Sequence, residues 1–133
     1  MTTLAYDIMG APSAASERTV FLLHGILGSR RNWATIGRRL AEAHPDCRFV
    51  LIDLRGHGDS HGQDRPHTVN GCAQDLLRLA QSLECRPETV IGHSFGGKVA
   101  LAYGRLDPEG LRHIWSLDSP PDSETLASAI SVT

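Results

Sequence analysis

Apolar residues follow two different patterns along this chain, and the first is a short continuous run. Four such runs cover residues 20–23, 49–54, 89–91 and 113–117. Continuous rather than alternating apolar character predicts strands buried on both faces, as in a parallel sheet. We expect a further strand at residues 4–8, followed by a loop of small residues from Gly10 to Ser16.

In the second pattern, apolar residues recur at helical spacing in the segments between these runs. A first apolar stripe covers residues 33–41 and ends at His44-Pro45, and a second extends from Val69 to Leu83 with Thr68 as the expected N-cap. A third helix-compatible segment follows at residues 97–103. Strands alternating with helices predict an α/β fold, in which right-handed crossovers place helices on both faces of a doubly wound, mostly parallel sheet.

The segment Gly92-His93-Ser94-Phe95-Gly96 joins an apolar run directly to the third helical segment. The pattern G-x-S-x-G between a strand and a helix is typical of a nucleophile elbow, a sharp strained turn that exposes its central serine. The flanking glycines leave room for close approach of the backbone. Ser94 is therefore the candidate nucleophile, and the alternative is an ordinary Gly/Ser turn.

A second strand-to-turn junction leads from residues 19–23 into His24-Gly25-Ile26-Leu27-Gly28-Ser29. Two converging backbone N–H groups stabilise the oxyanion of an acyl-transfer intermediate. We expect Ile26 and Phe95 to supply them, with Phe95 at a helix N-terminus. A dinucleotide site is poorly supported, because Gly25-x-x-Gly28 does not match G-x-G-x-x-G.

Five ordered motifs, spread over nearly all of the chain, resemble landmarks of the α/β-hydrolase superfamily, and most closely those of its small serine esterases. They are His24-Gly25-Ile26-Leu27-Gly28-Ser29, Asn32-Trp33, Asp53-Leu54-Arg55-Gly56-His57-Gly58-Asp59-Ser60, Gly92-His93-Ser94-Phe95-Gly96-Gly97-Lys98 and Leu117-Asp118-Ser119-Pro120. The resemblance implies an incomplete α/β-hydrolase fold that lacks the cap and the C-terminal strands. Residues 1–121 would form the N-terminal part of the core, and residues 122–133 the start of a cap region or a frayed tail.

The resemblance also implies a catalytic triad in the order serine, acid, histidine. No histidine follows Asp118, and His113 precedes it. Asp118, at the end of the fourth run, is either the triad acid or a cap for the following turn. We expect Asp53 to accept backbone N–H bonds in its own loop, and His24 to shape the oxyanion turn. His93 is expected to pack or hydrogen-bond beneath the elbow.

Composition agrees with one globular domain: 133 residues, 41% hydrophobic, 21% charged and a formal net charge of −2. This charge argues against a nucleic-acid partner, and Arg30-Arg31 and Arg38-Arg39 are interpreted as solvated positions. No signal peptide or membrane-length apolar stretch is visible, so we expect no membrane partner and a cytoplasmic location.

Cofactor and metal sites are not expected. The three cysteines at 47, 72 and 85 are odd in number and lack metal-ligand spacing, so they are interpreted as buried or half-buried thiols. His57 and His61 lie in a glycine-rich loop, whereas a pair at this spacing needs a helix to align it on a metal ion.

Three hypotheses of function follow. The first is a serine esterase or thioesterase that forms an acyl-enzyme on Ser94 and is impaired because the C-terminal histidine is absent. The second is a catalytically inactive binding or scaffold module, and the third recruits His24 or His57 as a substitute base. The expected partners are a small acyl ester or thioester and either a second copy or a complementing C-terminal chain covering the edge of strand 113–117.

Overall fold

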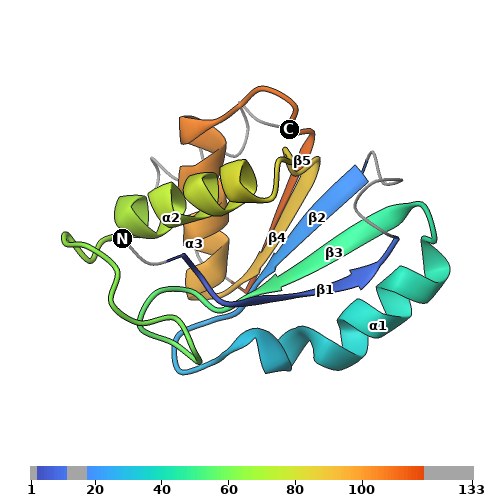
Figure 1. The fold of residues 1–133 in the computed structure, drawn as a ribbon, viewed down its shortest axis with the longest axis horizontal. Helices are drawn as coiled ribbons and strands as arrows, with labels where there is room; N and C mark the ends of the chain where they lie inside the picture. Colours follow the sequence, from blue (N-terminus) through green and yellow to red (C-terminus); the bar gives the residue numbers. More distant parts are fainter. Residues whose placement is uncertain (1–2, 12–17, 119–133) are drawn as a thin grey trace.

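A five-stranded sheet runs through the computed structural model, which describes residues 3–11 and 18–118 (Figure 1). Its strands are β1 (Tyr6–Gly10), β2 (Arg18–Leu23), β3 (Cys47–Ile52), β4 (Thr89–His93) and β5 (His113–Leu117). Their order across the sheet is β1-β3-β2-β4-β5, and only β1 pairs antiparallel to its neighbour. The prediction of a mostly parallel α/β sheet is confirmed.

Helices cover the two faces of the sheet unequally. The 3-10 helix η1 (Arg30–Trp33) and α1 (Ala34–Ala43) lie on one face, and α2 (Val69–Ser82) and α3 (Phe95–Leu106) lie on the other (Figure 1). The Thr68 hydroxyl accepts the Gly71 N–H at 2.9 Å, which confirms the predicted N-cap of α2.

The core is correspondingly split in two. The larger part joins α2 and α3 to the sheet and includes Phe21, Leu76 and Tyr103, whereas the smaller part joins α1 to the other face through Trp33 and Leu51. The central strands β2 and β3 contribute to both parts, as their continuous apolar sequence predicts.

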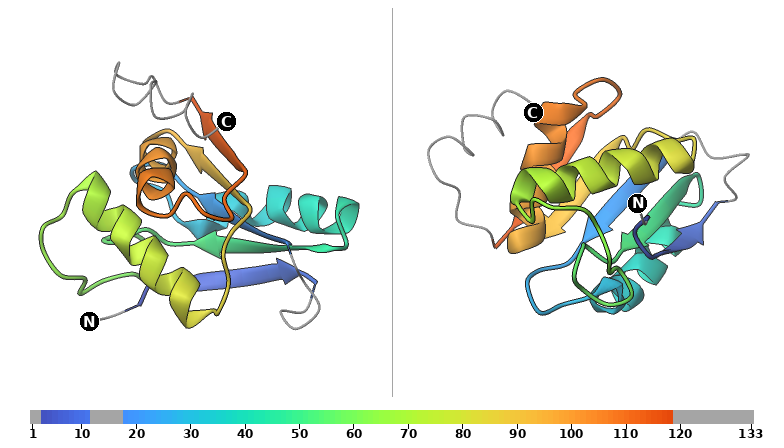
Figure 2. Two further views of the ribbon diagram at one scale, coloured as in Figure 1. Left: turned by 90° about the horizontal axis from the view of Figure 1, so that it is seen from above. Right: turned by 60° about the vertical axis from the view of Figure 1, so that its left-hand side comes forward.

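Two strand predictions are corrected. The N-terminal strand covers residues 6–10 rather than 4–8, so Gly10 belongs to it; part of the predicted Gly10–Ser16 loop lies outside the described residues. The run 113–117 is a strand, but it is not buried: Trp115 is 57% exposed and Leu117 is 42% exposed. β5 forms an edge of the sheet opposite β1, beyond the cover that α1 provides (Figure 2). The predicted boundary at residues 121 and 122 lies outside the described residues.

Candidate active site

Ser94 occupies the junction between β4 and α3 in a conformation that is costly for a non-glycine residue. Its φ is 55° and its ψ is −118°. A Cβ on Gly92 would overlap the Gly96 carbonyl, and a Cβ on Gly96 would lie 2.5 Å from the His24 carbonyl oxygen. These two glycines therefore allow the sharp turn and its close approach to the end of β2. Such backbone strain concentrates at functional sites.

The turn after β2 packs directly against this elbow. Gly25 to Gly28 form a β-turn in which the Gly28 N–H donates to the Gly25 carbonyl at 3.0 Å, and Leu27 has a φ of 66°. A Cβ on Gly25 would lie 3.2 Å from the Ser94 Cβ. Within the described residues, no backbone acceptor takes the N–H of Ile26 or of Phe95. Both predicted oxyanion donors thus lie in turns that meet at Ser94.

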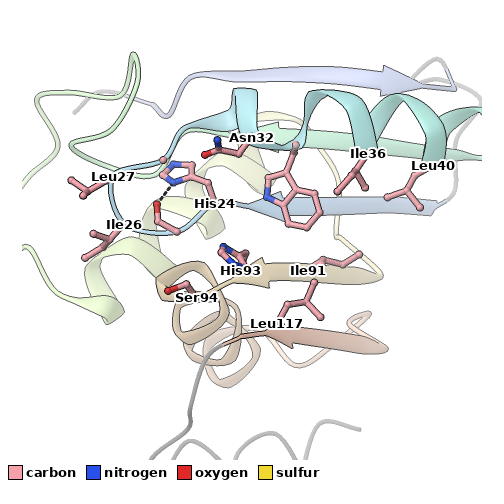
Figure 3. Close-up of a pocket in the computed structure, with 13 residues that line it drawn as sticks. His24, Ile26, Leu27, Asn32, Ile36, Leu40, Ile91, His93, Ser94 and Leu117 are labelled. Carbon is pink, nitrogen blue, oxygen red and sulfur yellow. Dashed lines mark hydrogen bonds between the residues drawn. The ribbon is translucent and has the colours of Figure 1, made fainter.

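His24 is buried beneath that turn with both ring nitrogens engaged. Nε2 accepts the Leu54 N–H at 3.0 Å, so the neutral ring must donate from Nδ1 to the Gly25 carbonyl at 2.7 Å (Figure 3). Burial lowers the pKa of His24, outweighing the hydrogen bond to Gly25. His24 holds the turn after β2 through its bond to Gly25, and it has no free nitrogen with which to act as a base.

His57 is also unsuited to the role of substitute base. Its ring lies against that of His24, with 4.9 Å between the centroids, and its Nδ1 lies 2.9 Å from the Arg55 carbonyl oxygen. His57 does not line the cavity that contains Ser94. The hypothesis that His24 or His57 replaces the missing base is therefore not supported by their positions.

Asp53 organises the loop that follows β3. Its carboxylate accepts the Arg30 N–H at 2.6 Å and the Asp59 N–H at 2.9 Å, and it pairs with the Arg30 guanidinium. Burial alone would raise the pKa of Asp53, but these hydrogen bonds and the Arg30 charge lower it. The structural role predicted for Asp53 is confirmed.

The interpretation of Arg30 as a solvated position is wrong. It is not a solvated helix position, because its guanidinium contacts three carboxylates, those of Asp7, Asp53 and Asp59. Arg31, Arg38 and Arg39 are exposed as predicted. The partners of Arg30 lie 23 or more residues away in sequence, so its local context did not reveal them.

A cavity of about 740 Å³ opens beside Ser94 on the α1 side of the sheet (Figure 3). Its walls are mostly apolar, and they include Trp33, Ile36, Leu40, Ile91 and Leu117. The helical stripe at residues 33–41 was interpreted only as a core-facing surface, yet three of its members line this cavity. Apolar lining with a few polar groups at one end is typical of small-molecule sites.

His93 and Asp118 lie together at the same end of the sheet. His93 is exposed and lines the cavity, so the prediction that it packs beneath the elbow is wrong. It is the last residue of β4 and lies on the same sheet face as Ile91, the α1 side, but its side chain is 53% exposed. Its Nε2 lies 3.9 Å from Asp118 Oδ2. The turn that Asp118 was alternatively expected to cap lies outside the described residues.

The remaining polar groups offer few further sites. Cys47 and Cys72 are buried and Cys85 is half-buried, in agreement with the sequence, and burial raises the pKa of Cys72 to about 11. Across residues 3–11 and 18–118, no cluster of three histidine, cysteine or acidic side chains has the arrangement of a metal site. In the same segments, no helix combines the length and apolar character needed to cross a membrane.

Comparison with known proteins places this geometry in a family context. A model of the α/β hydrolase fold matches residues 18–131. The sn-1-specific diacylglycerol lipase ABHD11 of Mus musculus is 29% identical over 128 residues, a match that covers 96% of this chain and 40% of the lipase. Esterase YbfF of Escherichia coli is 30% identical over 111 residues, covering 84% of this chain and 42% of the esterase.

Solved structures agree with the sequence matches. A thermophilic esterase from Thermogutta terrifontis superimposes with a TM-score of 0.75 at 29% identity, over 90% of this chain and 42% of the esterase. A marine microorganism esterase gives a TM-score of 0.75 at 26% identity, over 94% of this chain and 47% of that structure. The chain spans less than half the length of each of these four proteins.

Proposed function

The chain belongs to the α/β-hydrolase family, and from this membership we propose that it carries the nucleophile portion of a serine hydrolase acting on carboxylic esters or thioesters. The observation that carries the proposal is the conformation of Ser94, whose φ of 55° and ψ of −118° are tolerated between Gly92 and Gly96. A strained backbone at a strand-to-helix turn exposes the serine hydroxyl, where a substrate can reach it.

In the proposed reaction, the Ser94 hydroxyl oxygen attacks the acyl carbon, and the alcohol or thiol leaves with a proton. The Ile26 and Phe95 N–H groups stabilise the oxyanion of the tetrahedral intermediate. Water then hydrolyses the acyl-enzyme and restores the serine. Support comes from the contact between the two turns that carry these donors. Asp118 is proposed as the acid that orients the imidazole of the general base.

The family order of triad residues requires a histidine after the acid, and this chain has none after Asp118. We therefore propose that turnover by this chain alone is impaired and that a second polypeptide improves it. In the described part of the chain, β5 is an edge strand with Trp115 and Leu117 exposed, and such a polypeptide or a second copy would pack there.

The substrate class is proposed from the cavity beside Ser94. Its apolar walls favour an uncharged acyl group, and the polar groups of the elbow lie at one end, where the ester carbonyl would sit. The related proteins named as esterases and as a diacylglycerol lipase agree with this chemistry.

Labelling with a fluorophosphonate tests the proposal, because these reagents modify activated serines. We expect covalent labelling at Ser94 that Ser94→Ala abolishes, together with hydrolysis of p-nitrophenyl acetate well below about one turnover per second. Labelling no faster than that of a free serine hydroxyl would contradict the proposal and favour a non-catalytic binding or scaffold module. Fast turnover that Ser94→Ala abolishes would contradict only the impairment.

A further inference from the structure

Leu27 adopts a backbone conformation that suits glycine better than leucine. It is the third residue of the β-turn from Gly25 to Gly28, which is closed by the Gly28 N–H donating to the Gly25 carbonyl at 3.0 Å, and its φ is 66°. A left-handed backbone is costly for leucine because the Cβ crowds the following carbonyl oxygen. Glycine would adopt the same φ without that cost. The turn therefore carries a side chain at a position where a side chain is unfavourable.

Packing within the described fold does not offset this cost, since Leu27 is 96% exposed. Groups around Leu27 hold the turn instead. The Gly25 carbonyl also accepts a hydrogen bond from His24 Nδ1 at 2.7 Å, and the Ser29 N–H donates to the Asn32 side chain at 2.9 Å. Backbone strain of this kind concentrates at active sites and at residues that clamp a ligand. A bound ligand is thus the group that the Leu27 side chain is placed to contact.

Leu27 lies at the open end of the cavity that contains Ser94. Both residues line this cavity, and Figure 3 shows Leu27 and Ile26 toward the same end as Ser94, with Leu40 toward the opposite end. Trp33, on the inner wall, is only 7% exposed. A single exposed leucine is ordinary on a protein surface. This leucine is also strained and shares a cavity with the proposed nucleophile, and the combination indicates a role in substrate binding.

The two ends of the cavity suit the two parts of an ester differently. The acyl group stays bound to the serine after the alcohol or thiol has left, whereas the leaving group must reach solvent and give up its position to water. Toward Leu40 the cavity is enclosed by α1 and the sheet, and toward Leu27 it meets solvent (Figure 3). The acyl group therefore fits the enclosed end, and the leaving group fits the open end beside Leu27.

We propose that Leu27 makes this site specific for esters or thioesters with an apolar leaving group; the inference rests on the proposed function. An alkyl or aryl group of the alcohol or thiol packs against the Leu27 side chain, with the exposed Ile26 side chain beside it. Removing these apolar surfaces from water favours binding. A very small or strongly hydrated leaving group gains nothing from the contact. Leu27 thus selects the leaving group and takes no part in proton transfer.

Two phosphonate reagents that carry the same alkyl group test the inference at Ser94. One releases p-nitrophenoxide, which can contact Leu27, and the other releases fluoride, which is too small to do so. In Leu27→Gly and Leu27→Asn, the ratio of the first labelling rate to the second should fall by about 10-fold, because both residues accept a left-handed backbone but lack the apolar side chain. Leu27→Met should keep the parent ratio. Taking the ratio removes any change in the reactivity of Ser94 itself.

Glu84→Gly is the matched control for relief of backbone strain. Glu84 also has a left-handed φ, 51°, and it is exposed at the end of α2, outside the lining of the cavity. This variant should retain the parent ratio of labelling rates.

Failure of the inference and failure of the proposed function give different results. The parent ratio in both Leu27→Gly and Leu27→Asn, an equal fall in the two rates, or the same fall in Glu84→Gly overturns the role of Leu27 alone. If the parent labels no faster than Ser94→Ala with either reagent, the inference and the proposed function both fail. A lower ratio in Leu27→Gly and Leu27→Asn, with the parent ratio in Leu27→Met and Glu84→Gly, supports the inference.

Discussion

The Arg55 guanidinium forms a two-point ion pair with the buried Asp75 carboxylate, with 2.6 Å between Nε and Oδ2 and 2.7 Å between Nη2 and Oδ1. The same guanidinium donates to the carbonyls of Asp64, Pro66 and Gly71. The Arg55 side chain thus connects the loop after β3 to α2.

Removing the acid of this pair should be costly. Asp75→Ala leaves the buried Arg55 charge without its counter-ion, and we expect the free energy of unfolding to fall by about 3–5 kcal/mol. Arg78→Ala is the matched control, because Arg78 approaches the same carboxylate at 3.4 Å from a half-buried position. Its effect should stay below about 1 kcal/mol. Urea denaturation measures both, and equal losses would contradict a dominant role for Arg55.

Gly96→Ala should distort the elbow. The new Cβ would lie 2.5 Å from the His24 carbonyl oxygen and 2.7 Å from that of Leu23, and these backbone atoms cannot turn aside as a side chain does. We expect a loss of about 1–3 kcal/mol and slower labelling of Ser94. Gly37→Ala in α1 is the control, since its closest contact is the flexible end of Leu51 at 3.2 Å. Comparable losses in the two variants would refute this explanation.

Acid should destabilise the fold through His24. The folded-state pKa of His24 lies below its unfolded value because the ring is buried, so below about pH 6.5 the unfolded chain binds the extra proton first. Stability should therefore be complete above that pH and decline as the pH falls toward the lowered pKa. Asp53, whose pKa is also lowered, adds a separate loss at more acidic pH.

Urea denaturation at pH 7.5 and 5.5 measures the His24 contribution. His24→Gln should reduce the stability difference between the two conditions, even though it lowers stability at both. His44→Gln, at an exposed histidine, should retain the parent difference. An undiminished difference in His24→Gln would assign the pH dependence to other groups.

What the sequence predicted correctly is local in origin. Continuous apolar runs identified β2, β3 and β4 because their residues are buried on both faces, and the Thr68 cap acts on an N–H only three residues away. The elbow was predictable for the same reason, since G-x-S-x-G and its flanking elements occupy one short segment.

The errors concern what lies beside a segment in space. β5 has an apolar sequence like that of β4, but its exposure depends on the absence of a neighbour at that edge of the described sheet. The carboxylates around Arg30 come from distant parts of the chain, and His93 faces the cavity because α1 covers only part of its sheet face. Spacing along one sequence contains none of this information.

The open edge of β5 should promote association. Among the described strands, none pairs with the outer edge of β5, so its backbone groups beside the exposed Trp115 favour pairing with a second copy, and light scattering should detect species larger than the monomer. Trp115→Lys should shift any such species toward the monomer. Ile8→Lys, at a 42% exposed position on the opposite edge strand, should not. A stable parent monomer with rapidly exchanging outer β5 amides would contradict this prediction.

Supplying the remainder of the fold in trans should raise activity more than any point change in this chain. The proposed nucleophile Ser94, the proposed donors Ile26 and Phe95, and the proposed acid Asp118 lie at one end of this sheet, and a C-terminal portion from a full-length relative would add a histidine that follows the acid and further walls around the cavity. General-base catalysis is worth about 10²- to 10⁴-fold, and the gain in ester hydrolysis should fall in that range. It should vanish with Ser94→Ala. A complex that forms while Ser94 reacts no faster than in the lone chain would show that the elbow is not competent for catalysis, because a histidine that follows the acid would then be present.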